Sequence, residues 1–296
     1  MMPGRASRTA EYVAFFRALE SARPPRVRLF DDPYARHFLR PSLRRAVSCS
    51  RVPPLGGLIV WCADRRLPGA RTSAIARTRV IDDAVRRAGR DGIDQVVILG
   101  AGFDSRAYRL PELRAAAVFE VDHPATHAVK RVRLRRALPT IPANVRFVPI
   151  DFNRQQLPGV LADHGLDAQR RVLFLWEGVT NYLTAAAVDA VLRFVARCAA
   201  GTRLIFTYVH RGALDGSVAF EGAATLMRAV AQLAEPWTFG LDPSTLRGYL
   251  ADRGLRLEDD AGAREYRARC FGSAADRMRG YDFYHVAIAS VPNANA

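Results

Sequence analysis

The sequence predicts an α/β protein built on a mostly parallel sheet with helices on both faces. From Gln95 onward, short β-branched runs alternate with helical stretches, which is the pattern of strands joined by crossover helices. Several of the runs are almost entirely apolar, as strands buried on both faces are. A glycine turn with Gly100 and Gly102 follows the first run, at the place where open sheets approach their ligands most closely.

Seven strands are expected in order along the chain. A helix at 184–200, with Thr184 as its N-cap and Gly201 at its end, joins the fourth strand to the fifth. Two later strands, at 254–260 and 281–291, complete the sheet, the second of them as an antiparallel edge strand. The five earlier strands are expected at residues 95–100, 116–122, 145–151, 171–177 and 202–209.

The chain before the sheet is predicted to form a helical N-terminal cap over the ends of the strands. We place this cap segment at residues 1–90 and the sheet-containing, ligand-binding domain at 91–296, with a cap insertion at about 210–245. The expected pieces are helices at 10–22 and 72–88, a Pro/Gly-rich connector at 51–70, and a helix at 218–234 within the insertion.

The positive charge of the chain is concentrated near its N-terminus. The whole sequence carries a net charge of +15, and its first 90 residues hold 19 arginines against seven acidic residues, a net charge of +12. Such an excess reflects either a compositional bias or a surface that attracts an acidic substrate or an acidic carrier protein. No RNA-binding or zinc-finger signature accompanies the arginines, which argues against a nucleic-acid partner. Nothing in the pattern assigns an oligomeric state.

Several classes of protein are disfavoured. No apolar stretch approaches the about 20 residues of a membrane helix, and charges interrupt the start of the chain where a signal peptide would be apolar. We therefore expect a cytoplasmic protein with no membrane contact. The four cysteines form no C-x-x-C pair and have no histidine at zinc-ligand spacing, so no metal site is expected.

The glycine turn, Gly100-Ala101-Gly102, lacks the third glycine of a dinucleotide fingerprint. Ser105 occupies that position, with Asp104 beside it. The third glycine lets the helix start pack closely on the strand while its N-terminus holds a pyrophosphate. A carboxylate there repels a pyrophosphate, whereas it could pair with the ammonium group of S-adenosylmethionine. The turn therefore favours S-adenosylmethionine over NAD as the ligand.

Acidic residues end the next three strands. Asp122 lies about 20 residues after the turn, where an acid accepts the ribose hydroxyls of either cofactor. Asp151 and Phe152 could hold an adenine, unless Asp151 is only a helix N-cap. Glu177 would face the cofactor's ammonium or sulfonium, or else form a salt bridge with an arginine, because an unpaired carboxylate is costly there.

An ordered set of motifs resembles the leucine carboxyl methyltransferase family, in particular its bacterial branch of S-adenosylmethionine-dependent O-methyltransferases. The resemblance implies a class I methyltransferase, Rossmann-like fold and, for some members, a role in polyketide tailoring. The insertion shows no convincing match to the protein-methylating members, which argues against a protein C-terminus as substrate. The matching segments are RALE, LFDDPYARHF, ARTRVIDDAV, VVILGAGFDSRAYRL, VFEVDHPATHAVKR, VPIDFN and LWEGVTNYL.

The resemblance also implies roles for single residues. Arg77, with Arg17 as a second candidate, would hold the cofactor carboxylate, and Gly100 would lie against the methionine part. Asp122 would bind the ribose, Asp151 with Phe152 the adenine, and Glu177 would face the amino end.

The sequence leaves the chemistry at the acceptor open. A carboxylate acceptor needs no base, whereas a phenol or enol does; His210 is the candidate base, with Tyr208 and Tyr182 to orient a substrate. The function predicted is O-methylation of a small-molecule carboxylate or hydroxyl, possible acceptors being a polyketide or another secondary metabolite. The alternatives are an NAD(P)-dependent oxidoreductase and a non-catalytic cofactor-binding module that docks an acidic partner.

Overall fold

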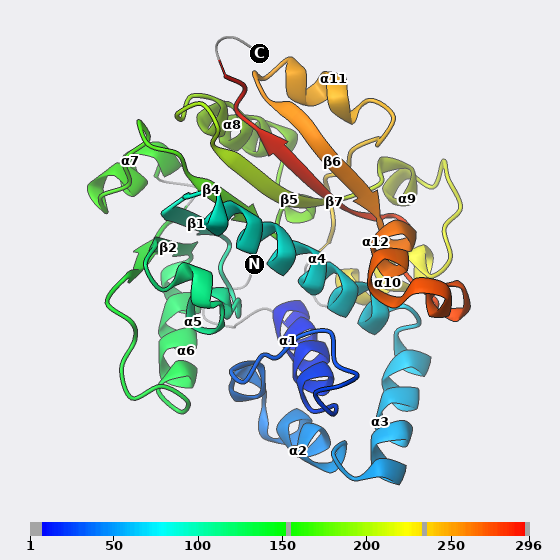
Figure 1. Cartoon of the computed structure of the whole chain (residues 1–296). Coiled ribbons are helices and arrows are strands. Elements are labelled where there is room, and N and C mark those ends of the chain that lie inside the picture. Colours follow the sequence, from blue (N-terminus) through cyan, green and yellow to red (C-terminus); the bar gives the residue numbers. More distant parts are fainter. Residues whose placement is uncertain (1–7, 152–154, 233–235, 294–296) are drawn as a thin grey trace.

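A seven-stranded sheet forms the centre of the computed structural model, which describes residues 8–151, 155–232 and 236–293 (Figure 1). Within these residues the strand order is β3-β2-β1-β4-β5-β7-β6. The strands are β1 (Gln95–Leu99), β2 (Ala117–Asp122), β3 (Val145–Pro149), β4 (Leu173–Trp176), β5 (Arg203–Val209), β6 (Arg256–Gly262) and β7 (Tyr284–Ser290).

Helices cover both faces of this sheet and its carboxyl edge. The α-helices are α1 (Arg8–Ser21), α2 (Pro41–Cys49), α3 (Pro53–Arg66), α4 (Ala70–Arg90), α5 (Arg106–Arg109), α6 (Pro124–Leu134), α7 (Leu157–Asp163), α8 (Ala185–Ala196), α9 (Arg211–Asp215), α10 (Ala223–Gln232), α11 (Leu246–Ala251) and α12 (Ala263–Phe271). Short 3-10 helices are η1 (Ala35–Phe38), η2 (Pro111–Leu113), η3 (Thr180–Tyr182) and η4 (Gly272–Arg277).

The pairing of the strands confirms the predicted α/β class and its mostly parallel sheet. Strands β1 to β5 pair in parallel, and β7 runs antiparallel to β5. One detail is corrected: β7 is not at the edge but lies between β5 and β6. The burial of the two strands explains the order, because Val286, Ala287 and Ala289 of β7 are buried whereas Arg256 and Glu258 of β6 are exposed.

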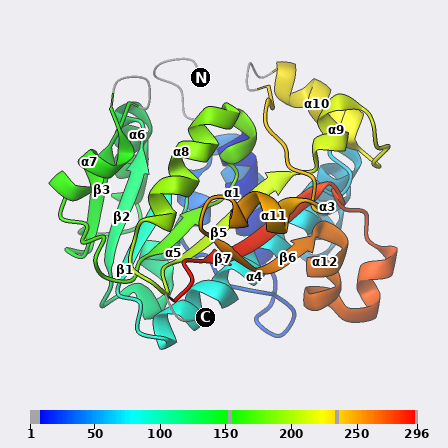
Figure 2. The same cartoon turned by 90° about the horizontal axis from the view of Figure 1, so that it is seen from above.

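Two apolar cores lie on opposite faces of the sheet. Helices α7, α8 and α11 contribute to one core, with side chains such as Leu161, Leu192 and Leu250. Helices α4 and α12 contribute to the other, where Val85 of α4 packs against the sheet. Figure 2 shows α8 and α4 on opposite sides of the central strands. The buried side chains along α4 therefore pack residues 70–90 directly against the sheet.

Residues 51–70, expected to be a connector, form helix α3 over most of their length. Pro53 and Pro54 fit the first helical turn, where a missing N–H costs nothing. Gly56 and Gly57 lower helix propensity by roughly 1 kcal/mol each relative to alanine but do not forbid the helix. The run of apolar and long polar residues that follows is sufficient to continue it.

A third apolar cluster joins the N-terminal helices to the carboxyl edge of the sheet. It holds Phe15 and Phe16 of α1, Phe38 of η1, and Phe283 beside β7. Part of the insertion after β5 also belongs to it, through Ala223 of α10. The N-terminal segment and the insertion therefore share one apolar cluster at the carboxyl ends of the strands.

Candidate active site

A cavity of about 1180 Å³ lies at the carboxyl ends of β1, β2 and β4, with α1 and α10 contributing to its wall. Its volume slightly exceeds the roughly 300–1,000 Å³ typical of ligand sites, so it offers room for a cofactor and an acceptor together. Ten of the residues singled out in the sequence line it: Arg17, Arg77, Gly100, Ala101, Gly102, Asp104, Asp122, Asp151, Tyr182 and Glu177.

The glycine turn has the left-handed backbone that favours glycine. Gly100 and Gly102 have φ values of +63° and +39°. A Cβ on Gly100 would lie 2.4 Å from Cγ2 of Val179, which follows β4. Although Gly100 lines the cavity, the group packed most closely against it is therefore a protein side chain.

Asp122 fixes the turn from the end of β2. Its Oδ2 accepts a hydrogen bond from the Gly102 amide at 2.6 Å, and its Oδ1 accepts one from the His123 amide at 2.6 Å. A carboxylate oxygen has capacity for more than one hydrogen bond. Asp122 on the cavity wall can thus hold the turn and still accept ribose hydroxyls.

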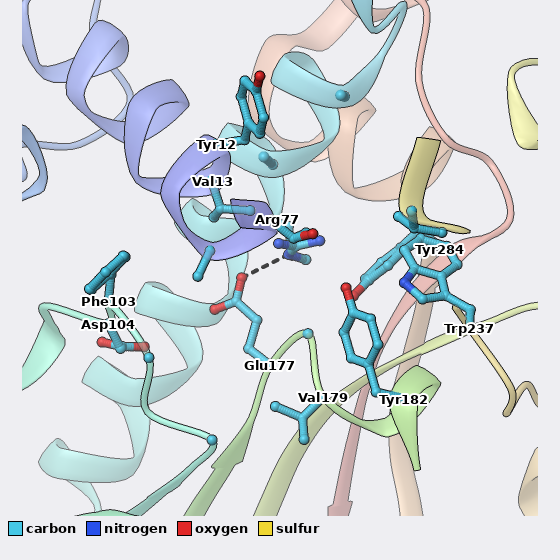
Figure 3. A pocket seen from close by; sticks show the side chains of 18 of the residues that line it. Tyr12, Val13, Arg77, Phe103, Asp104, Glu177, Val179, Tyr182, Trp237 and Tyr284 are labelled. Atoms are coloured by element: carbon cyan, nitrogen blue, oxygen red, sulfur yellow. Dashed lines mark hydrogen bonds and ion pairs between the residues drawn. The ribbon is translucent and has the colours of Figure 1, made fainter. Parts of the chain in front are cut away.

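Arg77 and Glu177 form a buried pair on the cavity wall. Arg77 Nε donates to Glu177 Oε1 at 2.8 Å (Figure 3). The guanidinium carbon of Arg77 also lies 4.7 Å from the ring centroid of Tyr284. Burial opposes the charge, but Glu177 and the nearby tyrosines together raise the pKa of Arg77 above its usual value. Arg77 is thus a permanently cationic, oriented group, which suits the carboxylate of an amino-acid ligand.

Asp104 and Glu177 share a second buried arginine, Arg106 at the start of α5. Arg106 Nη1 donates to Glu177 Oε2 at 2.8 Å and also to Asp104 Oδ2. Burial would raise the pKa of both carboxyls, but the charges of the arginines outweigh it and hold each pKa at about 2. Asp104, expected to meet a cofactor ammonium, thus already has a protein cation as partner, while it still lines the cavity.

Ser105, at the position of the missing glycine, connects the turn to the N-terminal segment. It is fully buried, and its Oγ donates to Asp32 Oδ2 at 2.6 Å. Arg109 Nε donates to the same Oγ at 3.2 Å, and its two Nη atoms donate to Asp82 at 2.6 and 2.7 Å. Arg106 Nε donates to Asp82 as well, at 2.8 Å. The serine therefore belongs to a buried charge network.

Arg17 extends this network from α1. Its Nη2 donates to the carbonyl of Phe103 at 2.5 Å, and its Nε lies 3.4 Å from Asp32 Oδ2. Four residues of this network are not among those predicted from the sequence: Asp32, Asp82, Arg106 and Arg109. Their signal was present in the paired acids of LFDDPYARHF and RVIDDAV and in the two arginines of FDSRAYRL, all unusual for segments that become buried.

Asp151 lines the cavity from the end of β3. Its amide donates to Oε1 of Gln155 at 3.0 Å, and the next helix, α7, has Gln156 as its N-cap. Asp151 is therefore not the N-cap of α7, and its role at the adenine stays a prediction. Phe152, its expected companion at the adenine, lies outside the described residues.

Aromatic side chains form the other end of the cavity. Tyr182 of η3, Trp237 after α10 and Tyr284 of β7 lie together in Figure 3, on the side of Arg77 away from Asp104. The Tyr182 and Trp237 ring centroids are 6.3 Å apart, and those of Trp237 and Tyr284 are 5.9 Å apart. No local sequence pattern indicates Trp237 as a site residue, because only folding brings the insertion to this edge.

Tyr208 and His210 do not line this cavity, contrary to the expectation for the end of β5. The hydroxyl of Tyr208 donates to Asp260 Oδ2 at 2.7 Å, in the core beside β6. His210 Nδ1 accepts from the Gly212 amide at 3.0 Å as the N-cap of α9. Because β7 pairs with β5, Tyr284 of β7 lies on the cavity wall instead. This placement lends no support to a catalytic role for Tyr208 or His210.

Comparisons with known proteins agree with this geometry. The family model for leucine carboxyl methyltransferase matches residues 10–196. A Frankia alni protein is 35% identical over 260 residues, which cover 84% of this chain and 87% of that protein. A Streptomyces avermitilis protein is 33% identical over 275 residues, covering 92% and 90%. Both carry the name "Putative S-adenosyl-L-methionine-dependent methyltransferase".

Solved structures share the fold. A DUF574 family protein from Streptomyces avermitilis superposes with a TM-score of 0.60 at 15% identity, covering 98% of this chain and 99% of the other. A Thermobifida fusca protein gives 0.59 at 18% identity, with coverage of 93% and 97%. The fold is that of class I methyltransferases, and S-adenosylmethionine, not NAD(P), is the cofactor. The chain belongs to the leucine carboxyl methyltransferase family of S-adenosylmethionine-dependent methyltransferases.

Proposed function

We propose that this methyltransferase acts on oxygen, and that its acceptor is the carboxylate of a small, largely apolar molecule. The description of the matching family names carboxyl methylation, which supports this choice. A polyketide or another secondary metabolite is the acceptor class that fits the resemblance. The proposal concerns the atom methylated and the kind of acceptor.

The observation that carries the proposal is the placement of the candidate bases. Of the three residues predicted to act on the acceptor, only Tyr182 lines the cavity. A carboxylate needs no base, because it is already ionised at neutral pH, whereas a phenol or enol must lose its proton. The one histidine among the described lining residues, His123, follows Asp122 at the end of β2, away from Tyr182 and Trp237 in the sequence and in the fold's strand order. The aromatic end therefore suits an acceptor that arrives ionised.

The chain's own residues supply binding and orientation. Arg77 would hold the cofactor carboxylate, Asp122 the ribose and Asp151 the adenine. The arginines beside Asp104 and Glu177 keep both carboxylates ionised near the cofactor's cationic part. When bound, S-adenosylmethionine supplies an electrophilic methyl group. Tyr182, Trp237 and Tyr284 would orient the acceptor and exclude water, which are the main tasks of a methyltransferase site.

Charge at the outer wall favours the same acceptor. Arg66 at the end of α3 and Arg228 of α10 line the cavity, and both are basic. The four acidic residues among the described lining, Asp104, Asp122, Asp151 and Glu177, all follow strands β1 to β4 at the cofactor end. An anionic acceptor would be attracted by these two arginines once it is within about 10 Å, the distance over which exposed charges act.

The test offers matched aromatic carboxylic acids and phenols with S-adenosylmethionine and follows the products by mass. We expect transfer to the carboxylic acids, giving methyl esters that alkali hydrolyses. Methyl products resistant to alkali, or transfer only to phenols, would overturn the proposal. Trp237→Ala should raise the acceptor KM by roughly tenfold or more, as loss of a buried aromatic contact does, while cofactor affinity stays within about twofold.

A further inference from the structure

Exposed apolar side chains gather on one helix of the N-terminal segment. Among the described residues, seven large hydrophobic side chains are exposed, and four of them lie between residues 52 and 61. Of these four, Leu58 and Trp61 are the most exposed, at 55% and 57%, and Val52 and Leu55 follow at 48% and 43%. Helix α3, fully described, has no buried residue, and Figure 1 shows it with α2 at the end of the molecule away from the sheet.

These side chains share one face of α3. Leu55, Leu58 and Trp61 follow one another at three-residue spacing, so they project on neighbouring turns of the same side. The adjoining side of α3 already has a place in the fold, because Ile59 and Ala63 pack against the third apolar cluster. We call the exposed side, formed by Val52, Leu55, Leu58 and Trp61, the α3 face.

Arginines border the α3 face. Residues 41–69 contain five arginines and a single acid, Asp64, whose carboxylate pairs with Arg71 at 2.6 Å. Arg51 is exposed at one end of α3 and Arg65 at the other, with the Arg65 guanidinium 5.5 Å from the ring centroid of Trp61. A second copy of the chain would bring these like charges together, whereas a negatively charged surface would be attracted.

The C-terminal end of α3 reaches the cavity. Arg66, the last residue of α3, and Leu67 directly after it both line the cavity. An apolar molecule held in a surface covered by α3 would therefore have a short path to the site.

We propose that the α3 face docks this protein on an anionic lipid surface. Apolar side chains with tryptophan on one face and arginines at its borders are the arrangement of helices that lie in a membrane interface. Leu55, Leu58 and Trp61 would enter the boundary of the headgroups, and the arginines would contact lipid phosphates. None of the helices in the described parts of the chain is long and apolar enough to cross a bilayer, and peripheral docking requires none.

The test measures binding of the full-length protein to vesicles by sedimentation. Vesicles of phosphatidylcholine with about 30% phosphatidylglycerol should bind the protein, and phosphatidylcholine alone should bind it at least about tenfold more weakly. Raising the salt from about 0.05 to 0.5 M should weaken the binding further. Trp61 emission should shift to shorter wavelength on binding, and this shift should vanish in Trp61→Phe.

A double variant, Leu58→Ser with Trp61→Ser, should lose binding to the anionic vesicles by about tenfold or more while keeping its affinity for S-adenosylmethionine. The matched control is Val132→Ser on α6, a valine that is 55% exposed away from α3, and it should bind as the parent does.

Three results would overturn the proposal. The first is equal binding by the double variant and the parent. The second is a concentration-dependent dimer that the double variant abolishes. The third is binding of an acyl carrier protein through α3 with no binding to vesicles.

Discussion

At the scale of single residues, Asp122 connects the second strand to the glycine turn. It accepts two backbone hydrogen bonds and lines the cavity at the same time. Its carboxylate thus holds the turn and also belongs to the proposed ribose site. Variants that remove different atoms of this side chain are needed to distinguish the two roles.

Asp122→Ala should weaken S-adenosylmethionine binding by about ten- to a hundredfold, because hydrogen bonds to a charged group contribute roughly 1.5–3 kcal/mol each. Isothermal titration calorimetry measures this directly. Asp122→Asn, which keeps one acceptor oxygen, should lose less. Binding by Asp122→Ala as tight as that of the parent would contradict the assignment of Asp122 to the cofactor site.

At the scale of elements, Ser105 joins α5 to the segment between α1 and η1. Its hydroxyl contacts Asp32, whose other oxygen accepts the amides of Tyr34 and Ala35 at 3.1 and 3.0 Å. Arg17 of α1 reaches both Asp32 and the turn. The serine thus does what a glycine could not, because it fastens the N-terminal segment to the start of α5.

Ser105→Gly, which would restore the dinucleotide fingerprint, should lower the free energy of unfolding by about 1–3 kcal/mol, since it removes the hydroxyl that donates to Oδ2 of the buried Asp32. It should also weaken S-adenosylmethionine binding and give no NADH binding. Urea unfolding and calorimetry measure these effects. Ser48→Ala, which removes an exposed hydroxyl that donates to the carbonyl of Arg44, is the control and should change neither quantity. Tight NADH binding would show that the turn alone selects the cofactor.

At the scale of the whole molecule, the charge network links the cap to the sheet. Asp82 of α4, Arg106 of α5 and Glu177 after β4 are all buried or nearly so. Breaking one partner of such a buried set leaves an uncompensated charge, which is strongly destabilising. The cofactor site and the fold are therefore expected to lose structure together when the network is protonated.

The stability of the protein should fall at acidic pH because of this network. The pKa of Glu177 is lowered from 4.5 to about 2 and that of Asp104 from 3.8 to about 2, with burial opposed and outweighed by the arginines. These two carboxylates contribute fully to the free energy of unfolding above the pKa values that they have in the unfolded chain. This contribution is lost as the pH falls from about 4.5 to about 2. Urea unfolding between pH 7 and 2 checks this.

Glu177→Gln should show a shallower loss over that pH range. The control is Glu221→Gln, which removes one partner of an exposed ion pair with Arg279 and should keep the slope of the parent protein. The same slope in Glu177→Gln and the parent would contradict the role of the network.

Most of the central sheet could be predicted from the sequence, because its signals are local. The apolar runs that form β1, β2, β4 and β5 are buried on both faces, whereas the edge strand β3 is partly exposed. Each predicted strand overlaps the observed one. The prediction of a connector at 51–70 was wrong because it gave more weight to the prolines and glycines than to the helix-forming residues that follow them. The prediction that β7 is an edge strand was wrong. The order of strands depends on which strand has the more apolar surface to bury, and the periodicity of a single strand does not reveal its neighbours.

The sequence by itself determined the fold class, the cofactor turn and the acids at the strand ends, since alternation, glycine and strand-end residues act over short distances. Only the tertiary structure decided what Ser105 contacts, which aromatic residues line the cavity, and that Tyr208 and His210 lie away from it. The physical reason is that these depend on contacts between segments far apart in the chain, such as Asp32 with Ser105 and Trp237 with Tyr284. Such contacts form only when the buried surfaces of the whole chain come together.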